Sequence, residues 1–198
     1  MTSALSVENL GLTIGGAKIL EGITLSVKQN ETLGIIGPNG AGKTSFFNLL
    51  SGLREATTGT IHLGDKEITN LKPHQRAQAG IARTFQTSSI FPFLSLLENV
   101  RIAAQVADGS SMNLTKGADK YKDVLYHASA CLEQVGLLNK GALFAGSLSH
   151  GDKRRLEIAI VLASKSDVVL LDEPMAGMSV ENVPELVEII RALATEHK

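Results

Sequence analysis

The chain has 198 residues, 43% of them hydrophobic and 20% charged, which suffices for one globular domain and excludes a disordered chain. The 19 basic and 20 acidic side chains give a formal net charge of −1, so no broad basic field favours a nucleic-acid partner. The longest apolar run, residues 158–163, is far shorter than the ~20 residues of a membrane-spanning helix, so we expect any membrane role to be peripheral.

Short apolar runs interrupted by turns predict a small antiparallel sheet near the N-terminus. Gly15-Gly16 and Gln29-Asn30 mark two of the turns, and no helical pattern separates the first strands. The strands predicted for the whole chain are Leu5–Val7, Ile23–Val27, Leu33–Ile36, Thr60–Leu63, Ile81–Phe85 and Val168–Leu171. The last of them is apolar without alternation, which is typical of a strand buried on both faces of an α/β core.

The third predicted strand leads into a glycine-rich segment that fits the pattern G-x-x-x-x-G-K-[ST], followed by a helical pattern over Ser45–Leu50. The segment reads Gly37, Pro38, Asn39, Gly40, Ala41, Gly42, Lys43 and Thr44. Glycines let backbone N–H groups crowd around phosphate oxygens, and the helix N-terminus adds partial positive charge. In such a loop the lysine reaches the β- and γ-phosphates and the threonine hydroxyl holds Mg²⁺. We therefore predict a phosphate site that includes Ser45; the alternative is a tight glycine turn with a surface lysine.

Two segments of helical apolar spacing, Leu96–Ala107 and Asp119–Val135, predict a helical insertion into the α/β core. The polar residues Asp108–Lys116 predict the loop between them. The only cysteine, Cys131, falls in the second segment and cannot form an internal disulfide. We expect its side chain to be small and partly buried.

A further helix is predicted to begin after Ser149. The Ser149 hydroxyl can cap it while Asp152 complements the helix dipole. Alternatively, the hydroxyl of Ser149, the N–H of Gly151 and the helix N-terminus form a second anion cradle. The basic run 153–155 in the same helix is expected to be a solvated face.

A carboxylate pair, Asp172-Glu173, follows the apolar strand 168–171. In open α/β sheets ligands bind outside the carboxyl ends of the strands, so Asp172 is expected to hold Mg²⁺, directly or through water. Glu173 is expected to orient or deprotonate the attacking water. An ordinary acidic turn closed by Pro174 is the alternative, but together with the glycine loop the pair indicates nucleotide hydrolysis.

The order and spacing of these motifs resemble those of the ATP-binding cassette (ABC) ATPases over essentially the whole chain. Leu148–Ala159 resembles the signature sequence of that family, and Arg83–Gln86 resembles its Q-loop. Within the family, the wording is similar to the ATPases of LIV-type uptake systems for branched-chain amino acids. The segments that carry this similarity are Ala82–Gln86, Leu97–Val100, Gly151–Asp152, Arg154–Ala159 and Glu173–Met178.

The resemblance implies an α/β fold, a P-loop NTPase (RecA-like) core with an antiparallel β subdomain and an inserted helical subdomain. The core is expected at about residues 1–87 and 160–198, and the helical subdomain at about 88–159. The implied cofactors are ATP and Mg²⁺, and the amide oxygen of Gln86 is expected to meet the metal or the water. Without the resemblance, Gln86 is a polar residue that closes a strand.

The resemblance also implies a mechanism built on two chains. Two cassettes, as a homodimer or a heterodimer, pack head to tail so that Ser149 and Gly151 of one cover the ATP on the glycine loop of the other. Further implied partners are transmembrane permease subunits and, indirectly, a substrate-binding protein, at the cytoplasmic face of the plasma (inner) membrane of a bacterium or archaeon. The apolar segment Thr87–Asn99 is expected either to offer a patch to a permease coupling helix or to fill the core between subdomains.

Three features depart from the pattern of the family. Ile14 stands where many members stack adenine on an aromatic ring, so an apolar face remains without π-stacking. Ser179 replaces an Asp or Asn that contacts the partner chain. The switch histidine of the family lies on a strand beyond Lys198, and His197, after a helix expected over Glu181–Thr195, is not a substitute. We therefore expect a cassette that is incomplete at its C-terminus.

These features predict an ATP-binding and ATP-hydrolysing subunit of an importer for branched-chain or hydrophobic amino acids. An importer ATPase for urea or short amides is the nearest alternative, because related systems look similar. A non-transport or catalytically impaired nucleotide-binding module is the other, since the switch histidine is missing.

Overall fold

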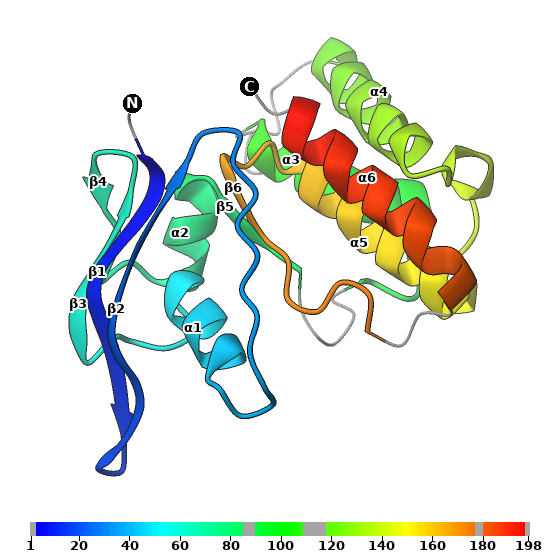
Figure 1. Cartoon of the computed structure of the whole chain (residues 1–198). Coiled ribbons are helices and arrows are strands. Elements are labelled where there is room, and N and C mark those ends of the chain that lie inside the picture. The colour runs from blue at the N-terminus through cyan, green and yellow to red at the C-terminus, as the bar shows by residue number, and fades with distance from the viewer. Residues whose placement is uncertain (1–2, 85–89, 109–117, 177–179, 197–198) are drawn as a thin grey trace. The chain divides into compact units, whose positions relative to one another are not determined.

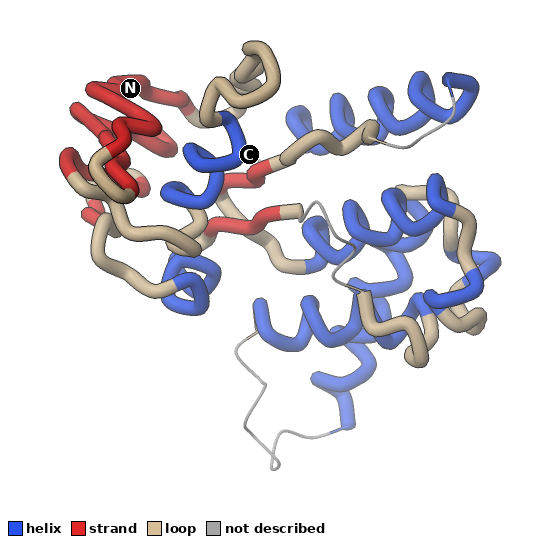
Figure 2. Tube along the Cα trace, turned by 90° about the horizontal axis from the view of Figure 1, so that it is seen from below, coloured by secondary structure: helices blue, strands red, loops and turns tan. Residues whose placement is uncertain are grey.

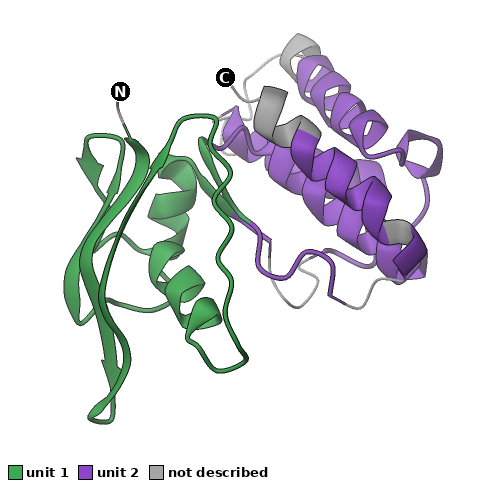
Figure 3. Ribbon diagram, in the orientation of Figure 1, with its two compact units in different colours: residues 1–82, 167–170, 194–198 green, residues 83–166, 171–193 purple. Residues whose placement is uncertain are grey.

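A computed structural model describes residues 3–84, 90–108, 118–176 and 180–196 of the chain (Figure 1). The chain forms two compact units, shown in two colours in Figure 3. Unit 1 comprises Met1–Ala82, Asp167–Leu170 and Ala194–Lys198, and unit 2 comprises Arg83–Ser166 and Leu171–Leu193. The subdomain boundaries expected from the sequence stay a prediction.

Unit 1 is built on a four-stranded antiparallel sheet of order β2-β1-β3-β4 (Figure 1). Its strands are β1 (Ser3–Ile14), β2 (Ala17–Lys28), β3 (Thr58–Leu63) and β4 (Lys66–Glu67). Gly15 and Gly16, both at positive φ, turn β1 into β2, and Leu5 and Val7 lie opposite Val27 and Leu25. The antiparallel sheet predicted for this part of the chain is confirmed.

Unit 1 contains two helices, of which the first covers apolar side chains of the sheet. Helix α1 (Lys43–Leu50) buries Phe46, Leu49 and Leu50 in one cluster with Val7, Leu10 and other residues of β1. Each such side chain contributes about 1.5–3 kcal/mol when fully buried. Helix α2 (Pro73–Ala79) begins with a proline at its first position, where the missing N–H has no helical partner, and ends at Gly80 with φ 110°.

Arg76 of α2 is the largest fully buried side chain of the described residues, at 2% exposure. Its guanidinium donates to four carbonyl oxygens, those of Leu49, Leu50, Thr69 and Leu71. Two of these acceptors belong to the last turn of α1, whose carbonyls lack partners within the helix. The arginine thus fastens the C-terminal end of α1 to α2.

A second, two-stranded sheet pairs β5 (Ile81–Arg83) with β6 (Val168–Leu170). The N–H of Val168 donates to the carbonyl of Gly80 at 3.0 Å as the pairing begins. Both strands were expected, although β6 buries Leu170 fully and Val168 and Val169 only in part. Phe85, the expected end of β5, lies outside the described residues.

The strand expected at Leu33–Ile36 is absent, and that prediction is wrong. None of these residues forms a backbone hydrogen bond with another described residue, and Ile36 is 95% exposed. An apolar run indicates a preference for burial, but a strand also requires a neighbouring strand for its N–H and C=O groups. Among the described residues no strand pairs with this segment.

Unit 2 is helical, as Figure 2 shows in blue. Its long helices are α3 (Leu96–Ala107), α4 (Ala118–Gln134), α5 (His150–Ala163) and α6 (Val183–Glu196), with 3-10 turns at Leu138–Lys140, Ala145–Ser147 and Val180–Asn182. Helices α3, α4 and α5 pack against one another, and their core includes Leu96, Leu132 and Leu156. Leu186 of α6 joins the same core.

The helices of unit 2 follow the sequence pattern closely. The first predicted helix matches α3 residue for residue, because Ser95 caps it by accepting a hydrogen bond from the N–H of Glu98 at 3.1 Å. The second matches α4 to within one residue at each end, and α6 occupies most of 181–195. The loop expected at 108–116 falls almost entirely outside the described residues.

Two expectations about side chains in unit 2 need correction. Arg154, in the basic run expected to be a solvated face, is only 6% exposed and is paired with Glu157 at 2.8 Å. Arg155, the next residue of the run, is paired with Glu185 of α6. Cys131 is fully rather than partly buried, and this burial raises the pKa of its thiol to about 11.

In the part of the chain that the structure describes, no helix is both long and apolar enough to cross a membrane.

Candidate functional site

The glycine-rich segment forms an exposed loop that ends at the N-terminus of α1. Gly40 and Gly42 have φ angles of 82° and 86°, a backbone region that favours glycine. Gly42 is the N-cap of α1 and no side chain caps the helix, so the first N–H groups are open to an anion. The loop therefore has the backbone geometry of a phosphate cradle.

Lys43 is folded back over this loop. Its Nζ donates to the carbonyl oxygens of Gly37 at 2.7 Å and Pro38 at 2.9 Å, while the N–H of Ala41 closes a turn onto Pro38 at 3.2 Å. No carboxylate among the described residues pairs with this ammonium. A cation held by neutral carbonyls beside open N–H groups is suited to an anionic ligand.

A larger residue at position 42 is disfavoured by contact with β2 as well as by the backbone φ angle. A Cβ at this position would lie 2.6 Å from Cδ2 of Leu20 and 3.3 Å from the carbonyl oxygen of Ile19. Gly40 has open space instead, so its glycine is required only by the backbone angle. The loop is thus seated directly against the hairpin of unit 1.

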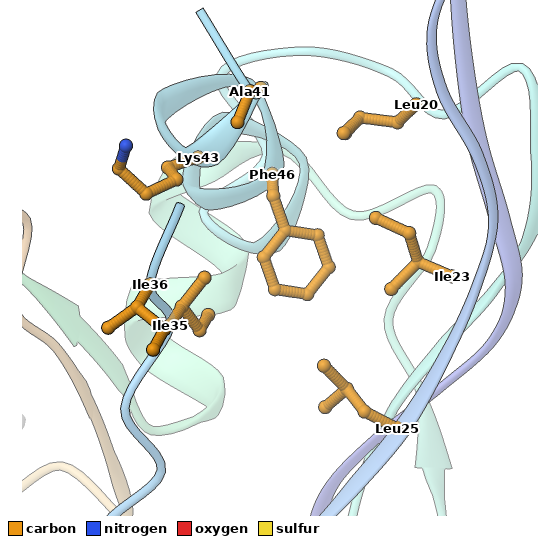
Figure 4. A pocket seen from close by; sticks show the side chains of 9 residues that line it. Leu20, Ile23, Leu25, Ile35, Ile36, Ala41, Lys43 and Phe46 are labelled. Carbon is orange, nitrogen blue, oxygen red and sulfur yellow. The ribbon is translucent and has the colours of Figure 1, made fainter. Parts of the chain in front are cut away.

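An apolar pocket of about 140 Å³ lies beside Lys43 (Figure 4). It is lined by Leu20, Ile23 and Leu25 of β2, by Ile35, Ile36 and Ala41 before the helix, and by Gly42, Lys43 and Phe46. Figure 4 shows the Phe46 ring between the β2 side chains and those of Ile35 and Ile36. The pocket exists because the segment before the glycine loop stands off from the sheet.

Asp172 follows β6 (Val168–Leu170) after one residue, Leu171, and it is buried, with 3% exposure. Its Oδ2 accepts a hydrogen bond from Nη2 of Arg83, at the end of β5, at 3.0 Å. Arg83 was noted in the sequence only as part of the Q-loop-like segment. Its pairing with Asp172 was not predicted, because the two residues are 89 positions apart and no local pattern links them.

Glu173 differs from its neighbour in exposure and in backbone. Its side chain is exposed, and its φ of 48° places a non-glycine residue in the left-handed region. Such a conformation costs on the order of 1–3 kcal/mol and is concentrated at functional sites. The N–H of Ala176 bonds to the Glu173 carbonyl at 3.0 Å and closes a turn there. The residue is held in a solvent-facing turn immediately after the buried aspartate.

Ser149 is the N-cap of α5, and its Oγ accepts a hydrogen bond from the N–H of Asp152 at 3.2 Å. Lys140 pairs with Asp152 at 2.6 Å, and Gly151 lies in the first turn, partly exposed. The predicted helix cap is therefore confirmed. The second anion cradle at Ser149 and Gly151 stays a prediction.

The predicted site residues are distributed over both units. The glycine loop and Ile14, 41% exposed at the end of β1, belong to unit 1; Ser149, Gly151, Asp172 and Glu173 belong to unit 2. Thr44 and Ser45 lie partly buried in the first turn of α1. Gln86 and Ser179 lie outside the described residues. Within unit 1 the residues of the glycine loop lie together, and within unit 2 Asp172 lies next to Arg83.

Each of the two units contains an oxygen donor of the kind that Mg²⁺ prefers, and the metal site predicted from them stays a prediction. Among the described residues no group of three His, Cys, Asp or Glu side chains could hold a metal alone. Mg²⁺ in nucleotide-binding enzymes is held by one or two protein oxygens, substrate phosphates and water. The Thr44 hydroxyl and the Asp172 carboxylate are oxygens of this kind, and the hydroxyl of Thr84, next to Arg83, is a buried donor with no partner in the described structure.

Comparisons with known proteins show which family this chain resembles. Residues 20–176 match the family model described as ABC transporter. The high-affinity branched-chain amino acid transport ATP-binding protein LivG of Salmonella typhimurium is 35% identical over 98% of this chain and 78% of its own length. The lipopolysaccharide export system ATP-binding protein LptB of Escherichia coli is 34% identical over 98% of this chain and 80% of its own length.

Among solved structures, the ADP conformation of MJ1267, an ATP-binding cassette of an ABC transporter, has a TM-score of 0.83 and 28% identity. The match covers 98% of this chain and 77% of that one. The predicted fold class, a P-loop NTPase with an antiparallel sheet and a helical region, is confirmed by this likeness. The prediction of an ATP hydrolase coupled to transport is confirmed at the level of the family. With its family match and its relatives over nearly the whole length, the chain belongs to the ABC transporter family.

Proposed function

We propose that this chain is the ATP-binding and ATP-hydrolysing subunit of an importer for branched-chain or other hydrophobic amino acids. The observation that supports it most is the open N-terminus of α1 with Lys43 seated on the loop carbonyls. The similarity to LivG supports the class of cargo.

Nucleotide binding starts at the glycine loop. The β- and γ-phosphates displace the carbonyls of Gly37 and Pro38 as partners of the Lys43 ammonium, which exchanges neutral acceptors for charged ones. Backbone N–H groups at the N-terminus of α1 would donate to the same oxygens, with no side-chain cap to displace. Ile14 offers an apolar surface to the base, so selectivity for adenine is expected to be low.

Hydrolysis requires the acidic pair of unit 2. Mg²⁺ bound with the nucleotide neutralises charge on the phosphates, and the Thr44 hydroxyl and Asp172 carboxylate would hold it, with Gln86 as a further oxygen donor. Glu173 is exposed and therefore accessible to water, which suits a residue that orients or deprotonates the nucleophile. Its left-handed backbone holds the carboxylate in a turn rather than on the strand.

ABC ATPases work as dimers with transmembrane permease subunits. We propose that Ser149 and Gly151 of a second cassette, an identical chain or a paralogue, cover the γ-phosphate. The N-terminus of α5 carries a serine cap and the partial positive charge of a 14-residue helix, which suits it to that anion. Closure on ATP and release after hydrolysis would then drive the permease between two conformations.

The permease is proposed to dock on an apolar patch of unit 2 made by Phe91, Phe93, Leu143 and Phe144. Two segments form it, because the N–H of Ala145 bonds to the carbonyl of Leu94 at 3.0 Å and that of Gly146 to Pro92 at 2.9 Å. Phe93 is 88% exposed and Phe144 is 64% exposed, so among the described residues these rings do not belong to a core. Of the two alternatives for this segment, exposure favours the interface.

The corresponding location is the cytoplasmic face of the inner membrane of a bacterium or archaeon, with peripheral attachment through the permease. A substrate-binding protein would act on the other side and contact this chain only indirectly. Lipopolysaccharide export is a second candidate function, because LptB matches nearly as well as LivG.

A transport assay in a strain deleted for the gene separates these functions. We expect loss of radiolabelled leucine, isoleucine and valine uptake, restored by the wild-type chain but not by Lys43→Ala or Glu173→Gln. Arg54→Met changes an exposed side chain outside the site and serves as the matched control, which should restore uptake. Unchanged amino acid uptake with defective lipopolysaccharide at the cell surface would support export, and loss of urea or amide uptake alone would support that class of importer.

A further inference from the structure

The buried ion pair between Arg83 and Asp172 links the two strand ends of the predicted metal site. The side chains are 6% and 4% exposed, and Nη2 and Oδ2 are 3.0 Å apart. Arg83 is the last residue of β5 and Asp172 follows β6, the two strands that pair in the second sheet. The pair therefore lies at one end of the two-stranded sheet, where Asp172 and Glu173 follow β6.

A buried carboxylate is costly unless it is paired, because its hydration is lost and the surrounding dielectric is low. In the metal-free chain Arg83 supplies the positive charge that Asp172 needs. A magnesium ion bound at the same carboxylate would supply it instead. Two cations near one carboxylate repel each other, so each must weaken the binding of the other.

We propose that Arg83 is a positioning residue that serves as the counter-ion of Asp172 while magnesium is absent and thereby sets the magnesium affinity of the nucleotide site. This inference rests on the proposed function, since it assigns Mg²⁺-nucleotide to the glycine loop and Asp172. The competing explanation is a purely structural tie between β5 and β6. A structural tie would contribute the same stability with and without the metal.

The two explanations differ in the stability of an Arg83→Met variant. As a counter-ion, Arg83 is needed most when the metal is absent, so the variant should be strongly destabilised in ADP with EDTA. Mg²⁺ should then recover most of the loss, because it replaces the missing charge. The Mg²⁺ concentration for half-maximal stabilisation should fall on the order of tenfold, which corresponds to about 1.4 kcal/mol.

The experiment is thermal unfolding of the full chain at saturating ADP, in EDTA and across a Mg²⁺ titration. The variants are Arg83→Met, Arg83→Lys and Arg83→Met with Asp172→Asn. Arg101→Met is the matched control, since Arg101 also pairs with a carboxylate, Glu98, but within α3. The lysine variant keeps the charge and should remain near the wild-type midpoint for Mg²⁺, and Arg101→Met should leave that midpoint unchanged.

Equal destabilisation of Arg83→Met with and without Mg²⁺, or an unchanged Mg²⁺ midpoint, would overturn the proposal, as would a lysine variant that matches the methionine variant. If Arg83→Met alone does not fold, the double variant decides: recovery of folding when both charges are removed supports the counter-ion, and continued unfolding contradicts it. Failure of the wild-type chain to respond to ADP at all would instead refute the proposed function.

Discussion

Replacement of Arg76 by methionine is expected to destabilise unit 1 severely although no residue of the nucleotide site is touched. The guanidinium is 2% exposed and has four carbonyl acceptors: Leu50 at 2.9 Å, Thr69 at 2.6 Å, Leu71 at 3.0 Å and, closer still, Leu49. Methionine fills a similar volume but leaves all four oxygens without this donor.

The magnitude follows from the acceptors. An orphaned buried carbonyl costs about 1–3 kcal/mol. The Leu49 carbonyl keeps the N–H of Gly52 at 3.2 Å, so the other three together cost about 3–9 kcal/mol. Burial also lowers the pKa of the Arg76 guanidinium below its usual value, which reflects the desolvation cost that methionine removes. We expect a net loss of about 3 kcal/mol, a large part of the ~5–15 kcal/mol of a typical domain.

Urea unfolding followed by circular dichroism measures this loss, with Arg54→Met as the control because the Arg54 side chain is exposed. The control should change the free energy of unfolding by less than about 0.5 kcal/mol. A loss below about 1 kcal/mol for Arg76→Met, at unchanged m-value, would refute the assignment of Arg76 as the fastening of α1.

Three further predictions concern a glycine, a histidine and the cysteine. Gly42→Ala should weaken the binding of a fluorescent ADP analogue at least tenfold, because position 42 has a φ of 86° and a Cβ there would lie 2.6 Å from Cδ2 of Leu20. Gly34→Ala, at a position with open space around it, should leave the binding unchanged. Burial, followed by the charge of Lys165, lowers the pKa of His127 from 6.5, so the unfolded chain binds a proton that the folded chain does not. The free energy of unfolding should therefore fall as the pH falls below 6.5, and His127→Gln should flatten this dependence in urea titrations from about pH 7 to about pH 5; an unchanged slope would contradict it. The Cys131 thiol, with its pKa raised to about 11, should resist iodoacetamide in the native chain and react once urea unfolds it, and rapid native labelling in mass spectrometry would be inconsistent with its burial.

The parts of the fold that the sequence predicted correctly depend on local chemistry. Helix α3 has a serine cap, an acidic first turn and a regular apolar stripe, and its bounds were predicted to the residue. The glycine loop has the positive φ angles that its glycines indicate. In both cases neighbouring residues determine the backbone, so a short window contains the information.

The parts that could not be predicted depend on distant partners. Leu33–Ile36 has the composition of a strand, but no strand of the described structure pairs with it. The basic run was expected to be solvated, but Arg154 is buried and Arg155 is paired with Glu185 of α6, 30 positions further along the chain. The Arg83–Asp172 pair joins residues 89 positions apart. Periodicity reports which side chains prefer burial, and not which element buries them.

The central claim is that a triphosphate binds at the open end of α1 through Lys43. Isothermal titration calorimetry of Mg-ATP into the folded chain tests it most directly, with Lys43→Ala and the surface variant Arg54→Met in parallel. The account predicts one saturable site in the wild type and in Arg54→Met, and its loss in Lys43→Ala while the variant remains folded. Absence of binding heat in the folded wild type, or equal affinity in Lys43→Ala, would contradict it.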